Sequence, residues 1–108
     1  MSYEIDRIRD AALRYKYELL QQAVRQYGTR YPKKHGEWYR AKTFDNNWLV
    51  YDTWNGCVYL YRYGAVPTDT DNMYRVAYAF RNIDGSVAFE EVVKPNTADF
   101  WRAHIIKQ

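Results

Sequence analysis

The N-terminal part of the chain has the apolar spacing of one long helix. Apolar residues recur three or four positions apart from Tyr3 to Tyr27, no glycine or proline interrupts them, and Gly28 follows where helices commonly end. The apolar arc is broader than one sheet face requires. We therefore expect a helix over residues 3–27 that a curved sheet clasps, with its remaining apolar edge covered by the C-terminal segment. The alternative for that edge is a seam with a second copy or a partner.

Strand-like segments separated by turn residues follow this helix. Asn55 with Gly56, and Asp84 with Gly85, are pairs typical of tight hairpins, and such short connections favour antiparallel pairing. No helical crossover is present that would allow a parallel pair. The pattern predicts an antiparallel sheet of about five strands within residues 37–94. Its members are expected at residues 37–42, 48–52, 57–63, 73–81 and 86–93.

The two remaining segments flank the predicted sheet. Residues 29–36 are basic and contain proline and glycine, which indicates a linker. Residues 96–106 have the pattern of a short helix that Asn96 or Thr97 caps and that docks through Phe100 and Trp101. The order of helix, antiparallel meander and helix is typical of the α+β class.

Chain length favours one domain over residues 1–108, because two domains cut from 108 residues would each be too small for a sound core. The layout of one long helix followed by an antiparallel meander resembles that of cystatin-like folds. This resemblance concerns the arrangement of elements alone, and such layouts host many functions.

The strand at residues 57–63 alternates strictly and carries the main candidate surface. Its tyrosines point to one side, and Val58 and Leu60 point to the other. We expect the helix to cover the row of large side chains in the fourth strand, from Tyr74 to Phe80, so that the arginines of that strand point away from the helix. Leu49 is expected to lie on the same side as these arginines. The predicted Tyr/Arg surface consists of Tyr51, Tyr59, Tyr61, Tyr63, Arg75 and Arg81.

The main alternative for this surface is burial. If the C-terminal helix, led by Phe100 and Trp101, lies across the tyrosines, they form a second core layer and no docking area is left. Tyrosine and arginine are otherwise the residues enriched at binding hot spots, and both can stack on unpaired bases.

Composition adds charge and aromatic content to this picture. The net charge is +3, so the protein should be attracted mildly to polyanions. Aromatic residues make up 19% of the chain, and 12 of them are tyrosines. Arg30, Lys33 and Lys34 in the linker are candidates for a mobile basic arm that contacts phosphate or an acidic partner; a solvated connection is the simpler interpretation. A single cysteine and the absence of a signal-peptide pattern favour a cytoplasmic protein, and no apolar run is long enough to span a membrane.

The sequence has no constellation typical of catalysis or metal binding. Cys57, His35 and His104 are scattered without paired spacing, and Asp69 with Asp71 lacks the rest of a calcium loop. Cys57 has no neighbouring base that would activate its thiol. No cofactor or metal is expected, and the balance is against an enzyme. The acid and lysine spacing of metal-dependent nucleases is also broken, since Glu91 and Lys94 are three positions apart and fall on opposite faces of a strand.

Three functions remain open. The first is a non-catalytic protein-binding module of adaptor or inhibitor type, either monomer or homodimer, of the small kind common in phages and mobile elements. The second is RNA or single-stranded nucleic-acid binding through the same surface and the basic arm. The third is a small-molecule pocket between sheet and helix, with Asp52, Glu91 or His104 as acid or base.

Overall fold

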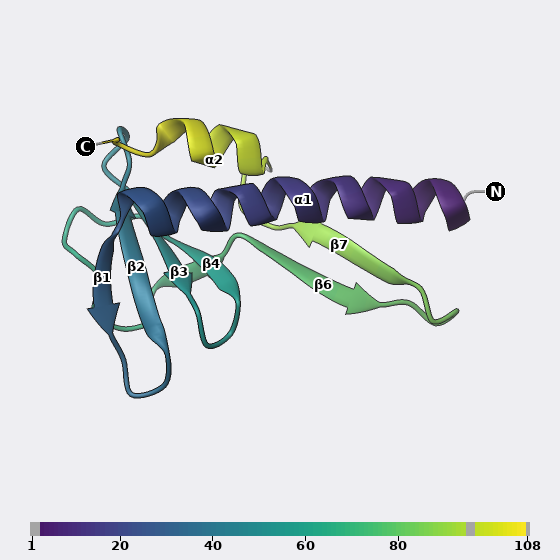
Figure 1. Cartoon of the computed structure of the whole chain (residues 1–108), viewed down its shortest axis with the longest axis horizontal. Helices are drawn as coiled ribbons and strands as arrows, with labels where there is room; N and C mark the ends of the chain where they lie inside the picture. Colours follow the sequence, from purple (N-terminus) through teal and green to yellow (C-terminus); the bar gives the residue numbers. More distant parts are fainter. Residues whose placement is uncertain (1–2, 95–96, 108) are drawn as a thin grey trace.

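The long N-terminal helix is the element against which the rest of the chain packs (Figure 1). The computed structural model describes residues 3–94 and 97–107, with side chains from residue 8 onward, and its first helix is α1 (Tyr3–Tyr27). The N–H of Gly28 closes the helix by donating to the carbonyl of Val24 at 2.8 Å. A Cβ atom on Gly28 would overlap that oxygen and lie 3.1 Å from the backbone of Arg40, so only glycine allows the next strands to approach so closely.

Two antiparallel sheets and a short helix follow α1. The larger sheet has five strands in chain order and the smaller one is a hairpin that extends along the N-terminal half of α1 (Figure 1). The fold is α+β, as the sequence predicted. The strands are β1 (Thr29–Pro32), β2 (Glu37–Lys42), β3 (Trp48–Asp52), β4 (Cys57–Tyr61) and β5 (Met73–Arg75) in the larger sheet, then β6 (Ala77–Arg81) and β7 (Val87–Glu91) in the hairpin, and the chain continues into α2 (Ala98–His104).

Two predictions about the sheet were wrong. Residues 29–32 of the expected linker form strand β1, which pairs with β2 from Thr29 opposite Arg40 to Pro32 opposite Glu37. The expected single strand over residues 73–81 is two strands, because the chain bends at Val76. The N–H of Val76 donates to Val58 in β4, whereas its carbonyl accepts from Val92 beyond β7, so Val76 passes the chain from one sheet to the other.

The core lies where α1 passes between the larger sheet and α2. Leu20 and Val24 of α1 are fully buried, and so are Leu49, Val58 and Leu60 on the sheet face below them. On its other side α1 packs against α2, and Trp101 of α2 and Ile105 directly after it are each 1% exposed. The C-terminal segment therefore covers, along the second half of α1, the apolar edge that the sheet leaves open, as was predicted. Thr97 is the N-cap of α2, and its side chain accepts from the N–H of Phe100.

The opposite face of the larger sheet carries a second, smaller core. Trp38 and Val50 are buried there, and the loop of residues 64–72 lies over them with Pro67 fully buried. The Arg40 guanidinium holds the loop by donating to the Pro67 carbonyl at 2.8 Å, and Lys42 and Trp48 both donate to the carbonyl of Gly64. Part of the face that was expected to be open is thus closed by a loop and not by the C-terminal helix.

Within the residues that the structure describes, no helix combines the length and the apolar character needed to cross a membrane.

Candidate binding surface

Tyr59 and Arg75 are the members of the predicted surface that the structure brings together. They are directly opposite each other in the register of β4 and β5, so their side chains share the sheet face turned away from α1. The pKa of the Arg75 guanidinium is raised, mainly by a hydrogen bond with Tyr59. Arg75 is exposed, which leaves a charged donor available beside a tyrosine ring.

Tyr61 and Tyr63 lie further along the same strand direction, next to the loop of residues 64–72. Their rings meet edge to face with centroids 5.1 Å apart, and Tyr61 is opposite Trp48 in the register. Tyr63 lies beyond the end of β4 and is 52% exposed. These tyrosines lie at the end of the sheet face that is next to the loop, and they are not part of the depression described below.

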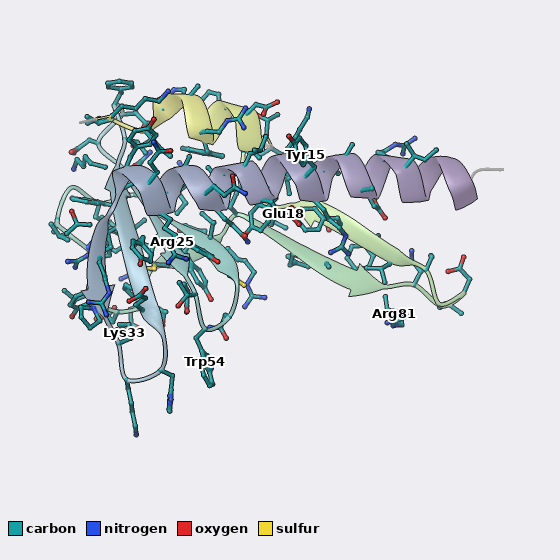
Figure 2. The ribbon with its side chains drawn as sticks, in the orientation of Figure 1. Tyr15, Glu18, Arg25, Lys33, Trp54 and Arg81 are labelled. Carbon is teal, nitrogen blue, oxygen red and sulfur yellow. The ribbon has the colours of Figure 1, made fainter. Side chains whose placement is uncertain are left out.

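Tyr51 and Arg81 do not belong to the surface that was predicted for them. Tyr51 is opposite Val58, which places it on the sheet face that α1 covers, and Leu49 is opposite Leu60 on the same covered face. Arg81 lies at the far end of the hairpin, well away from the larger sheet (Figure 2), where its guanidinium donates to the carbonyl of Gly85. The error at Tyr51 comes from assigning faces across a turn, because a register shift of one residue reverses every side chain. The error at Arg81 comes from the bend at Val76, which places Arg81 in another sheet than Arg75.

The hairpin turns toward α1 the face that was predicted to point away from it. The large side chains Tyr78 and Phe80 point away from α1 and are 38% and 41% exposed. The side facing α1 carries Ala77, Ala79 and, from β7, Phe89, whose ring meets Tyr17 of α1 edge to face at 5.3 Å. Small residues at alternate positions of β6 are the sequence signal for this arrangement, because a helix can approach alanine more closely than tyrosine.

Exposed aromatic side chains of β5 and β6 gather beside Arg75. A depression of about 490 Å³ lies between the edge of the larger sheet and the hairpin. Tyr74 is 52% exposed and Val92 is 37% exposed, and the Tyr78 ring lies 6.1 Å from that of Phe80. We call this area the hairpin surface; it consists of Tyr59, Met73, Tyr74, Arg75, Tyr78, Phe80 and Val92.

A second hollow, here called the helix groove, adjoins the hairpin surface at Arg75 and Tyr78. It has a volume of about 400 Å³ and lies between α1, the turn that precedes β4, and the hairpin. Arg14 and Glu18 of α1 border it, and the Arg14 guanidinium lies 5.2 Å from the centre of the Phe89 ring. Figure 2 shows Glu18 on the side of α1 that faces the strands. Gln21 closes one end by donating to the carbonyl of Gly56 at 2.9 Å.

The predicted basic arm is part of the larger sheet or its turns. Arg30 is in β1 and forms an ion pair with Glu37 of β2. The hydrogen bond from the Tyr39 hydroxyl, and after it the interaction with Arg30, lowers the pKa of the Glu37 carboxyl. Lys33 donates to the carbonyl of Thr68 and lies 4.1 Å from the centre of the Trp38 ring. Lys34 is exposed in the turn between β1 and β2. Arg30 and Lys33 are therefore held by contacts with the rest of the protein, whereas Lys34 is exposed.

Residues with catalytic or ligand chemistry have separate structural roles. Asp52 closes the turn after β3 by accepting from Trp54 and Asn55, and Glu91 accepts from the N–H of Ala98 at the start of α2. His104 contacts the carbonyl of Phe100 through Nδ1, and its ring stacks on the Phe100 ring. Among the described residues no group of three or more His, Cys, Asp and Glu side chains is placed to hold a metal ion.

Comparison with known proteins finds no protein family, no curated protein and no solved structure that matches this chain.

Proposed function

We propose that the protein is a non-catalytic binding module that holds a segment of another protein on the hairpin surface. The observation that carries this proposal is the gathering of Tyr74, Tyr78 and Val92, each more than a third exposed, around a depression bordered by Arg75, with the exposed Phe80 ring beside Tyr78. Clustered apolar side chains on a surface are typical of interaction sites, and tyrosine and arginine are enriched where binding energy concentrates.

The hairpin surface is also free of the elements that were candidates to cover it. Trp101 of α2 is buried in the core on the far side of α1, and Phe100 packs against Trp101 and His104. The loop of residues 64–72 lies over Trp38 and Val50 in the larger sheet, next to β1 and β2. A partner could therefore reach the hairpin surface without displacing α2 or this loop.

Nucleic-acid binding has less support from the same structure. Stacking of bases requires free aromatic faces. On the sheet face near the predicted basic arm, the protein's own cations already lie over the aromatic rings. Arg40 lies 4.0 Å from the centre of the Tyr31 ring, and Lys42 lies 4.8 Å from that of Trp48. A small-molecule enzyme has less support as well, because Asp52, Glu91 and His104 lie at the ends of different elements.

Selection of random peptides displayed on phage tests the proposal. We expect the wild-type chain to enrich peptides that the variant Tyr74→Ala/Tyr78→Ala/Phe80→Ala does not retain. Tyr15→Ala is the matched control, because Tyr15 is an aromatic residue that is 62% exposed on α1 and lies outside the hairpin surface. Equal retention by wild type and triple variant would contradict the proposal. Tight binding of an RNA oligonucleotide that falls steeply with added salt would support the nucleic-acid alternative instead.

A further inference from the structure

Strand β6 has one open edge. The N–H of Asn82 donates to the carbonyl of Ser86, and the N–H of Val92 donates to the carbonyl of Val76. Both pairs fit the register in which Tyr78 is opposite Glu90, so the even-numbered residues of β6 point their N–H and C=O groups at β7. Those of Ala79 and Arg81 consequently point away from β7, and both residues are exposed.

The other strand edges are protected by devices that β6 lacks. β1 contains Pro32 and the ion-paired Arg30, and β5 is three residues long. β7 lies along α1. β6 has the sequence Ala-Tyr-Ala-Phe-Arg, with Arg81 as its charged residue. Figure 1 shows β7 on one side of it and, within the described part of the chain, no strand on the other. An exposed apolar edge of this kind is a template for pairing with another chain.

The helix groove adjoins this strand. Ala77 and Ala79 line the groove and leave room that larger side chains would fill. The charged residues that line the groove are the cations Arg14 and Arg75 and one carboxylate, that of Glu18. Arg81 lies on the same face of β6 as the two alanines. Side chains of an added strand that point to this face would therefore meet mostly positive charge. Those that point to the other face would lie beside Tyr78 and Phe80.

We propose that an extended segment of the partner adds to β6 as a third strand, with acidic side chains toward the helix groove and apolar side chains beside Tyr78 and Phe80. This inference rests on the proposed function and specifies its partner. Main-chain hydrogen bonds to Ala79 and Arg81 would supply affinity, and the alternation of acidic and apolar residues would supply selectivity. Cross-strand neighbours of tyrosine and phenylalanine are favourable when they are β-branched or aromatic.

Charge argues against a second copy of the chain as the occupant. Antiparallel pairing of two β6 strands about Ala79 would place Arg81 of each copy opposite Ala77 of the other, close to Arg75. Like charges brought together in this way oppose pairing. A foreign segment with acidic residues at those positions would be attracted instead.

Synthetic peptides and amide exchange measured by NMR test the proposal on the full chain. The first probe is an acetylated peptide of about eight residues that alternates glutamate and valine, a length typical of strands. The second replaces glutamate with lysine, and the third carries N-methyl groups at adjacent central residues of the first. We expect the glutamate peptide to bind and to slow exchange of the Ala79 and Arg81 amides, and the other two to bind at least about tenfold more weakly, which corresponds to about 1.4 kcal/mol.

A pair of variants at Ala79 checks the same contact from the protein side. Ala79→Pro removes an N–H that points away from β7, a position where edge strands tolerate proline, and Ala79→Ser keeps that N–H. We expect the proline variant, and not the serine variant, to lose at least about tenfold in affinity for the glutamate peptide. If the proline variant fails to fold, the comparison with the N-methylated peptide decides.

Each other result overturns the inference in a recognisable way. Equal binding of the glutamate and N-methylated peptides, or binding without slower exchange at Ala79 and Arg81, would show side-chain docking without strand addition. In that case the proposed function stands. Slow exchange at Ala79 in the free protein together with a dimer mass in light scattering would make a second copy the occupant. Failure of the glutamate peptide to bind, while phage-displayed peptides still depend on the hairpin surface, would overturn only the partner assigned here.

Discussion

The hydroxyl of Tyr17 links α1 to the start of β4. It accepts a hydrogen bond from the N–H of Val58 at 2.7 Å, and its side chain is 6% exposed. Burial is the main cause that raises the pKa of this phenol, so the hydroxyl stays protonated. Tyr17→Phe would leave the Val58 N–H buried without a partner, and we expect it to lower the free energy of unfolding by about 1–3 kcal/mol in urea titrations.

The control for that prediction is Tyr15→Phe. Tyr15 is 62% exposed two residues away on α1, so loss of its hydroxyl should change the unfolding free energy by less than about 0.5 kcal/mol. Equal losses in both variants would mean that the bond to Val58 contributes nothing that water does not replace.

Glu91 gives the unfolding free energy a pH dependence. Burial is the main cause that raises the pKa of its carboxyl, against the opposing effects of the Ala98 N–H and of Lys16. The folded chain therefore keeps this proton to a higher pH than the unfolded chain, and the stabilisation is present at low pH and lost as the pH rises through the titration of the carboxyl. Glu91→Gln removes this titration. We expect the stability of wild type relative to the variant to decrease between about pH 4 and about pH 7.

Urea titrations of both proteins at the two pH values measure this difference. A stability difference that instead grows with pH would show that the ionised carboxylate is favoured in the folded chain, through its 2.6 Å bond to the Ala98 N–H.

At the scale of elements, local sequence patterns predicted the helix and the hairpin turns correctly, whereas the packing of one element on another was predicted less well. The spacing of apolar residues gave the bounds of the long helix, and Asn-Gly and Asp-Gly gave the hairpin turns, because these signals are local. The bend at Val76 could not be predicted, since it depends on pairing with Val58 on one side and with Val92 on the other. The face presented by Tyr78 and Phe80 follows from that bend, and the candidate surface was therefore placed on the wrong side of the hairpin.

Two phenylalanines on opposite faces of the hairpin test this assignment. Phe89 packs on Tyr17 and under Arg14, whereas Phe80 is 41% exposed. We expect Phe89→Ala to lower the free energy of unfolding by about 2–4 kcal/mol, near the range for buried aromatic residues. Phe80→Ala should cost less than about 1 kcal/mol while removing peptide binding. The reverse order in urea titrations would mean that the hairpin packs through its other face.

At the scale of the whole molecule, burial is concentrated at one end. Among the residues of α1 whose side chains the structure describes, from residue 8 onward, the buried ones lie from Tyr17 to Val24, next to the larger sheet and α2. The side chains of residues 8–16 are exposed or half-buried, and in the hairpin Ala77 is the buried residue. The proposed binding site is thus built on the less buried half of the fold. The sequence did not predict this division, because the apolar positions of α1 continue almost to its N-terminus.

Native-state hydrogen exchange should resolve the two halves. A two-stranded sheet is marginal by itself, and regions with few buried contacts open at lower free energy than the core. We expect the hydrogen-bonded amides of residues 9–16 and of the hairpin to exchange through openings of lower free energy than those of β2, β3, β4 and the second half of α1. One common opening free energy for all amides would contradict this, because the hairpin would then be as stable as the core. If the division holds, a segment that adds to β6 should raise protection along the hairpin and the adjoining half of α1, since both border the helix groove.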